Sequence, residues 1–153
     1  MLEVREEDVR FMRLALKEAS RAGRAGEVPV GALLVRDGEV LSGAYNLREI
    51  LKDPSAHAEI LALRVGAEKS DGWRLTGATL YVTKEPCIMC AGAIINARVS
   101  RLVYGCRDVK AGGVDSLYNI LNDKRLNHQV EVISGVLEEE CAALLRDFFR
   151  ERR

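Results

Sequence analysis

The feature that most constrains this chain is a pair of short segments rich in metal-binding side chains. One contains His57 and Glu59, and the other contains Pro86, Cys87 and Cys90. Imidazole nitrogen and thiolate sulfur are preferred ligands of Zn²⁺, and a tetrahedral site with three protein ligands keeps its fourth position for water. The chain is therefore expected to bring His57, Cys87 and Cys90 together around one catalytic zinc ion.

The local spacing of these residues favours such a site. Cys87 and Cys90 are three residues apart, so on a helix they lie one turn apart on the same face, and Pro86 suits the helix start. A helix N-terminus also favours the thiolate form of cysteine. Glu59 follows His57 by two residues and can reach the zinc-bound water without being a ligand, so it is the predicted catalytic proton carrier.

The same residues match the pattern H-x-E … P-C-x-x-C, and in this the chain resembles the zinc-dependent nucleoside and nucleobase deaminases. Within that family it is similar to the bacterial tRNA-specific adenosine deaminases, over a stretch from about Val9 to the C-terminus. The segments that carry this resemblance are 29–32, Asn46, 53–59, 85–93, 104–108 and 147–149. The resemblance implies a cytidine deaminase-like fold, α/β in class, with three α/β/α layers and a mixed sheet of about five strands.

The resemblance also implies an activity. The expected enzyme is a zinc-dependent hydrolase that uses a zinc-activated water to deaminate adenosine to inosine at the first, wobble, anticodon position of tRNA. Its partners would be a tRNA anticodon stem-loop and a second copy of the chain. The family pattern places the following residues against the substrate: Asn46, Ala58, Arg107, Asp108, Lys110, Phe149 and Arg150.

Two of these segments have an ordinary structural interpretation as well. Asn46 starts a polar loop, where an asparagine side chain commonly caps a turn. The segment 107–116, with its Gly112-Gly113 pair, also has the composition of a solvated, flexible loop. Only the resemblance shifts the interpretation of both towards substrate binding.

Length and charge set further limits. The chain has 153 residues, which predicts a single zinc-dependent deaminase domain over residues 1–153. There is no run of ~18 apolar residues and no apolar signal core near the start, so we expect a cytoplasmic protein that does not engage a membrane. Lys plus Arg and Asp plus Glu both number 23, so binding to RNA must come from local patches rather than from net charge.

Hydrophobic periodicity and turn signals predict alternating helices and strands. Helices are expected over about 6–22, from 55 or 56 to about 68, over 87–97 and over 137–151, and strands over 28–35, 39–45, 78–83, 101–106 and 130–133. In the second helix the predicted inward face consists of Ile60, Leu61, Leu63 and Ala67. A strand, a helix and a strand between 78 and 106 predict a parallel pair, with catalytic groups at the carboxyl ends of its strands.

The last helix combines an apolar stripe with an aromatic side chain at its edge. The predicted buried stripe consists of Leu137, Cys141, Leu144, Leu145 and Phe148. Phe149 falls roughly 95° from the centre of that stripe. Its basic neighbours are Arg146, Arg150, Arg152 and Arg153. This arrangement suits stacking on an unpaired base, and the alternative is a flank that covers the domain edge or a subunit contact.

Four further features complete the expectations. Cys106 and Cys141 are expected to be small buried apolar residues. His128 is a possible fourth ligand, but a lone exposed histidine is the preferred interpretation. Lys84 stands where the family usually has an apolar residue, and it either faces the pocket rim and meets a phosphate or snorkels outward. The expected dimer contact is the helix from Cys87 with nearby loops. Its Ala91-Gly92-Ala93 stretch allows close approach of a second chain, or equally of the sheet in the same chain.

Three functions therefore remain open. The first is deamination of adenosine in RNA, and the second is the same zinc chemistry on a free base, nucleoside or nucleotide such as guanine, cytosine or cytidine. The basic, aromatic-bearing last helix argues against the second. The third is a structural zinc module in which Cys106, Cys141 or His128 closes the site, and Glu59 would have no purpose there.

Overall fold

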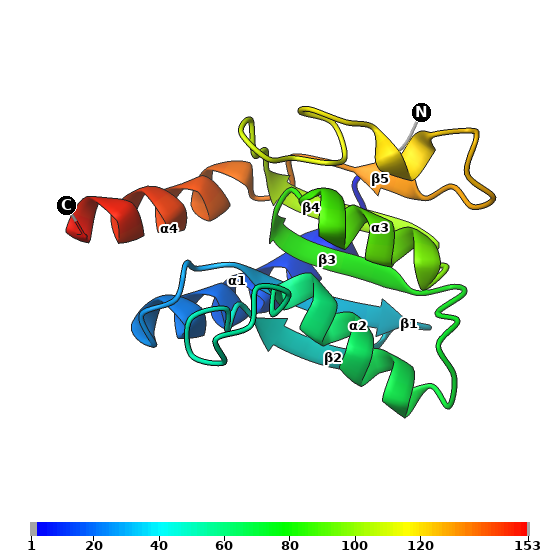
Figure 1. The fold of residues 1–153 in the computed structure, drawn as a ribbon, viewed down its shortest axis with the longest axis horizontal. Coiled ribbons are helices and arrows are strands. Elements are labelled where there is room, and N and C mark those ends of the chain that lie inside the picture. The colour runs from blue at the N-terminus through cyan, green and yellow to red at the C-terminus, as the bar shows by residue number, and fades with distance from the viewer. Residues whose placement is uncertain (1–2, 153) are drawn as a thin grey trace.

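The chain forms a five-stranded sheet with helices on both faces, as the computed structural model shows for residues 3–152 (Figure 1). Its elements are α1 (Glu6–Arg24), β1 (Gly31–Arg36), β2 (Glu39–Tyr45), α2 (Ala58–Lys69), β3 (Thr79–Lys84), α3 (Ile88–Asn96), β4 (Arg101–Cys106), the short 3₁₀ helix η1 (Ile120–Asn122), β5 (Glu131–Ile133) and α4 (Glu138–Glu151). The strand order is β2-β1-β3-β4-β5. The predicted three-layer α/β/α fold with a mixed sheet is confirmed.

The direction of the strands changes in the middle of the sheet. The pairs β1–β2 and β1–β3 are antiparallel, whereas β3–β4 and β4–β5 are parallel. The tight turn at Asp37 and Gly38, both with positive φ, joins β1 to β2 as the sequence predicted. The predicted parallel pair is β3 with β4, and the helix between them is α3.

Two apolar layers hold the helices to the sheet. One layer lies between the sheet and the α2–α3 face and includes Leu34, Leu80 and Leu102. The other lies under α1 and the start of α4 and includes Met12 and Cys141. Figure 1 shows α2 and α3 on one face of the sheet, α1 on the other, and α4 extending beyond the ends of the strands. No helix within residues 3–152 has the length and apolar character needed to cross a membrane.

The predicted inward face of α2 is partly wrong. The buried residues of α2 are Ala58, Glu59, Ala62, Leu63 and Gly66, whereas Ile60, Leu61 and Ala67 are only half-buried. The reason is close packing against β1, because a Cβ atom on Gly66 would lie 2.2 Å from Cδ2 of Leu34. Small residues let the helix approach the sheet, so the larger side chains turn to its flanks.

The buried stripe of α4 is also narrower than predicted. Cys141 and Phe148 are buried, but Leu137, Leu144 and Leu145 are half-buried. Because α4 runs beyond the strands, only part of its apolar side has the sheet to pack against (Figure 1). Its C-terminal half is thereby carried to the end of the sheet where α2 and α3 begin.

Candidate active site

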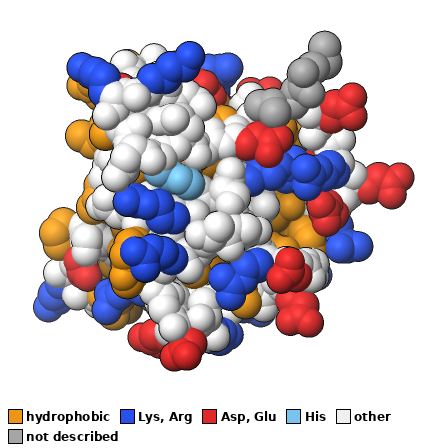
Figure 2. Space-filling model, turned by 90° about the vertical axis from the view of Figure 1, so that its right-hand side faces the viewer, with side chains coloured by type: hydrophobic (Ala, Val, Ile, Leu, Met, Phe, Trp, Pro, Cys, Tyr) orange, Lys and Arg blue, Asp and Glu red, His pale blue; other side chains and the backbone are white. Residues whose placement is uncertain are grey.

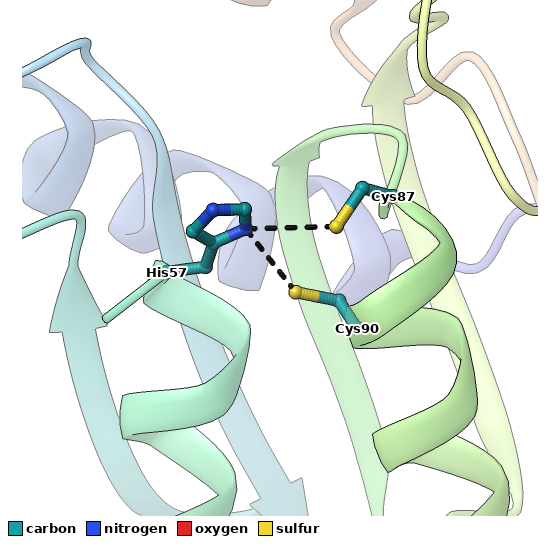
Figure 3. A group of neighbouring side chains, drawn as sticks. All are labelled: His57, Cys87 and Cys90. Atoms are coloured by element: carbon teal, nitrogen blue, oxygen red, sulfur yellow. Dashed lines mark hydrogen bonds between the residues drawn. The ribbon is translucent and has the colours of Figure 1, made fainter. Parts of the chain in front are cut away.

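The predicted metal ligands come together where α2 and α3 begin. His57 is the residue immediately before α2, Cys87 immediately precedes α3, and Cys90 lies in the first turn of α3. Nδ1 of His57 is 3.6 Å from Sγ of Cys87 and 3.5 Å from Sγ of Cys90 (Figure 3). Tetrahedral zinc with nitrogen and sulfur ligands places such atoms about 3.5 Å apart. The three side chains therefore fit a zinc ion.

The two thiols have opposite tendencies to ionise. A hydrogen bond donated by Cys90, assisted by His57, lowers the pKa of Cys87 to about 3 despite its partial burial. The same hydrogen bond, together with burial, raises the pKa of Cys90. A cation among these ligands would favour the thiolate form of both cysteines.

Glu59 lies in the first turn of α2, on the wall of the cavity next to the metal ligands. Its side chain is only 4% exposed, and burial is the main reason why its pKa is raised above the ordinary value for glutamate. The cavity has a volume of about 240 Å³ and is lined by both His57 and Glu59. A buried carboxyl group with a raised pKa at a metal site is well suited to accept and return protons near neutral pH.

The structure brings some, but not all, of the predicted substrate residues to this cavity. Those that line it are Asn46, Ala58, Asp108 and Phe149. The lining does not include Arg107, Lys110 or Arg150, which are exposed residues of the same loop and helix. Arg48 and Lys84 also line the cavity. The prediction did not include Arg48, because an arginine in a polar loop carries no local signal for a pocket.

Asn46 has a clear structural role in addition to its place in the cavity wall. Its side-chain amide donates to the carbonyl of Val28 at 3.2 Å, and its side-chain oxygen accepts from the backbone N–H of Arg48 at 3.1 Å. The side chain thus joins the segment before β1 to the loop after β2. Nearby, the buried carboxylate of Glu27 accepts the backbone N–H groups of Glu49 and Ile50. This support was not apparent from the sequence.

The loop after β4 has exposed side chains, including Arg107 and Lys110, but buried hydrogen bonds hold its backbone. The carboxylate of Glu85 accepts backbone N–H groups of the loop at distances of 2.8 to 3.2 Å, from Asp108, Val114, Asp115 and Ser116. Burial alone would raise the pKa of Glu85, but these hydrogen bonds and the hydroxyl of Ser116 lower it. The loop is therefore fastened to the residue that precedes Pro86 and Cys87.

The Gly112-Gly113 pair is required by this attachment. A Cβ atom on Gly112 would lie 2.3 Å from Oε2 of Glu85, and one on Gly113 would lie 3.0 Å from the backbone of Ile88. Glycine is thus the residue that permits this approach at position 112. A carboxylate next to the metal-binding segment, combined with a glycine pair in a later loop, is the signal that would have suggested the contact.

Lys84 points to the rim of the cavity, which decides between its two predicted orientations. Its Nζ lies 3.2 Å from Oδ2 of Asp108, and its side chain is 31% exposed. The other carboxylate oxygen of Asp108 accepts the backbone N–H groups of Lys110 and Ala111, each at 3.1 Å. Asp108 therefore links a turn of its own loop to the end of β3.

The two neighbouring aromatic residues of α4, Phe148 and Phe149, lie in different surroundings. Phe148 is buried, whereas Phe149 is 52% exposed and lines the cavity. Their rings meet edge to face, 5.4 Å apart. The basic neighbours are largely engaged, since Arg150 pairs with Asp147, Arg146 pairs with Glu139 and Arg152 lies over the ring of Phe148. Arg153 lies outside the described residues.

The remaining candidates stand apart from the metal site. Cys106 and Cys141 are buried, as predicted. His128 is neither a ligand nor an exposed residue, because its half-buried ring is 2.7 Å from the carbonyl oxygen of Val99. Within residues 3–152, the metal-binding group consists of His57, Cys87 and Cys90 alone. A closed structural zinc site needs a fourth protein ligand, and the described residues offer none, so this interpretation is not supported.

Comparison with known proteins gives a consistent picture. Residues 6–153 match the family model of the MafB19-like deaminases. The chain is 51% identical to the tRNA-specific adenosine deaminase of Bacillus subtilis (strain 168), over 96% of this chain and 91% of that protein. It is 47% identical to a solved structure from a study of A-to-I editing by tRNA:A34 deaminases at the wobble position, with a TM-score of 0.86 over 89% of this chain and 99% of the other.

A more distant similarity involves a free base. The chain is 33% identical to the solved guanine deaminase of Bacillus subtilis, with a TM-score of 0.63 over 68% of this chain and 66% of the other. Both the identity and the structural agreement are lower than for the tRNA deaminases.

Proposed function

The chain belongs to the MafB19-like deaminases and, among them, to the tRNA-specific adenosine deaminases, and from this premise we propose that it converts adenosine to inosine at the first anticodon position of a tRNA. The observation that carries the proposal is the position of Glu59. It lies on the wall of a cavity that also contains the metal ligands His57 and Cys87. The product would be the 6-oxo base, with release of ammonia.

The metal centre in this proposal is Zn²⁺, held by His57, Cys87 and Cys90. Bound zinc would supply the Lewis acidity that makes water nucleophilic at neutral pH. Glu59 would accept a proton from the attacking water, and would then deliver protons to N1 of adenine and to the departing amine at C6. The burial that raises the pKa of Glu59 favours both directions of transfer.

The cavity also suggests how the base is held. With a volume of about 240 Å³ it suits a single base, so the target nucleotide would have to be splayed out of its loop. Asn46 and Ala58 would lie beside the bound base. The half-exposed ring of Phe149, which also lines the cavity, would stack on a base next to the target. The exposed Arg107, Lys110 and Arg150 would contact the RNA farther from the base.

We further propose that the enzyme is a homodimer joined through α3 and the loop after β4. Ile88 of α3 is 55% exposed, and Leu117 and Tyr118 of the loop are more than half exposed. Gly92 on α3 has open space on its side-chain position, which leaves room for a second backbone. Two-fold pairs are the commonest closed assemblies. A tRNA substrate would place this enzyme in the cytoplasm.

A deaminase of a free base remains the second candidate, because the guanine deaminase of Bacillus subtilis is similar in structure. The deciding experiment compares ammonia release from an RNA hairpin, with adenosine at the first anticodon position, against release from free adenosine, guanine and cytidine. We expect rapid reaction of the hairpin and little reaction of the free compounds. Faster reaction of guanine or cytidine than of the hairpin would overturn the assignment.

A further inference from the structure

Lys84 is a cation held in an unusual place, at the rim of the candidate active site. It is the last residue of β3 and directly precedes the segment that contains Glu85 and Cys87. Its side chain lines the cavity, with 31% of its surface exposed. The sequence alone left two orientations open for this side chain, and the structure selects the one that faces the cavity.

The ion pair between Lys84 and Asp108 keeps the ammonium group in position. Oδ2 of Asp108 lies 3.2 Å from Nζ, while Oδ1 is held by the backbone of its own turn. Asp108 is in turn tied to Glu85 through its backbone N–H at 3.0 Å. An ammonium group has three donors, and a carboxylate oxygen occupies one of them. Within residues 3–152 the side chain of Lys84 makes no second ion pair, so its remaining donors can face a ligand.

The chemistry of a nucleotide indicates what that ligand is. If the base enters the cavity towards Glu59, the phosphodiester groups on either side of its ribose must remain near the rim. Lys84 and Arg48 are the lysine and arginine side chains that line the cavity. Within residues 3–152, Arg48 has no ion pair, so Lys84 is the one of the two that is already held in place. A preorganised cation at the rim matches a phosphate group better than it matches any part of adenine.

Building on the proposed function, we propose that Lys84 binds a phosphate that flanks the target adenosine, and that Asp108 positions Lys84 for this contact. On the face of the molecule turned to the viewer in Figure 2, Lys and Arg side chains are interspersed with Asp and Glu. With a net charge of zero over the chain, recognition of a polyanion depends on individual cations such as this one. The contact is independent of the base sequence, since it reads only the backbone.

The first experiment measures how binding depends on salt. We would compare wild type, Lys84→Met and Lys84→Arg in binding to the RNA hairpin over a range of KCl concentrations. Loss of one phosphate contact makes the fall of log affinity with log salt less steep, by about 0.7 for single-stranded RNA. Lys84→Met is expected to show this decrease and roughly ten-fold weaker binding, and Lys84→Arg is expected to retain both values.

A second experiment locates the phosphate. Two hairpins would carry a neutral methylphosphonate, one on the 5′ side and one on the 3′ side of the target adenosine. On one of these neutral hairpins, the kcat/KM of wild type should fall to the value that Lys84→Met has on the native hairpin. The kcat/KM of Lys84→Met itself should be almost the same on that neutral hairpin as on the native one. The ratio of kcat/KM between wild type and Lys84→Met is the deciding quantity. If this ratio is the same on both neutral hairpins as on the native one, Lys84 contacts neither phosphate and the proposal is overturned.

Matched controls separate this contact from general effects. Arg125→Met removes a cation from an exposed ion pair with Asp123 outside the cavity lining, and it should leave the salt slope and kcat/KM unchanged. If Lys84→Met does not fold, Lys84→Gln and the response of wild type to the two neutral hairpins carry the test. If wild type does not deaminate the native hairpin, the proposed function fails, whereas an unchanged salt slope in Lys84→Met refutes the phosphate contact alone.

Discussion

Arg101 donates two hydrogen bonds to the carboxylate of Asp8, from Nη1 to Oδ1 at 2.6 Å and from Nη2 to Oδ2 at 2.8 Å. The hydroxyl of Tyr81 also donates to Oδ1, at 2.9 Å. Asp8 is fully buried and Arg101 is 4% exposed. This cluster connects α1 to β3 and β4 on the face of the sheet opposite to α3. A charged group in such a position depends on its partner, because water cannot replace it.

Asp8→Asn is therefore expected to destabilise the protein by about 3 kcal/mol at neutral pH, since it removes the carboxylate that makes both hydrogen bonds to Arg101 and leaves the more distant Glu131, 3.8 Å from Nε, as its counter-charge. Urea denaturation followed by circular dichroism would measure this. Glu139→Gln, which breaks the exposed pair with Arg146, is the matched control and should leave the free energy of unfolding almost unchanged. Equal losses in the two variants would contradict the role assigned to Asp8.

The same pair makes stability depend on pH. Burial would raise the pKa of Asp8, but hydrogen bonds from Arg101, the backbone of Arg5 and Tyr81 outweigh it and lower the pKa in the folded state. Its stabilisation is therefore complete above the unfolded pKa of about 3.9 and is lost as the pH falls through the lower folded value. The difference between wild type and Asp8→Asn should accordingly shrink in denaturation experiments below about pH 4.

Metal content tests the proposed zinc ligands. We expect about one zinc per chain in the purified protein and loss of most of it in Cys87→Ala, because two ligands do not hold zinc tightly. Cys106→Ala is the matched control, since Cys106 is buried and lies outside the metal-binding group. Elemental analysis gives the readout. Full zinc in Cys87→Ala would remove that residue from the site.

Glu59→Gln tests the proton carrier. The substitution keeps the size of the side chain but removes the group that accepts a proton, so kcat should fall by about 10²–10⁴-fold. Zinc content and the thermal midpoint should stay close to those of wild type. Single-turnover deamination of the hairpin is the measurement, and a near wild-type rate would show that another group carries the proton.

Phe149→Ala tests recognition of the RNA around the target. A lost stacking contact of about 1–3 kcal/mol should lower kcat/KM on the hairpin by about 5- to 150-fold. Trp73→Ala is the matched control, because Trp73 is similarly exposed, at 53%, but is not part of the cavity lining. If both variants lose activity to the same extent, or neither does, Phe149 has no special role in binding.

Gly92→Arg tests the proposed dimer. Apart from its chain neighbours and the backbone of its own helix, no atom of residues 3–152 lies within 4 Å of the side-chain position of Gly92, so the fold should tolerate the change. A bulky, charged side chain there would obstruct a partner packed on α3, and light scattering should show a shift from a dimer towards the mass of one 16.9 kDa chain. Ala25→Arg, at an exposed position after α1, is the control and should remain dimeric. A wild-type protein that is monomeric at micromolar concentration would contradict the dimer.

Local patterns in the sequence were sufficient for the elements and for the metal ligands. The bounds of β2 and β4 agree with the predicted strands 39–45 and 101–106, because a two-residue turn and a short apolar run are signals that act over a few neighbours. The approach of His57, Cys87 and Cys90 was also predictable, since the ligand types and the turn-length spacing of the two cysteines reflect short-range chemistry.

The partners of the charged residues could be known only from the tertiary structure. Asp8 meets Arg101 across 93 positions, and Glu85 holds a loop that begins after the next strand. Lys84 faces the cavity because Asp108 comes to lie beside it, and the small residues of α2 face the sheet because β1 passes close to Gly66. Periodicity states which residues of one element share a face. Which element covers that face depends on the order of strands in the sheet, and that order is settled by packing of the whole chain.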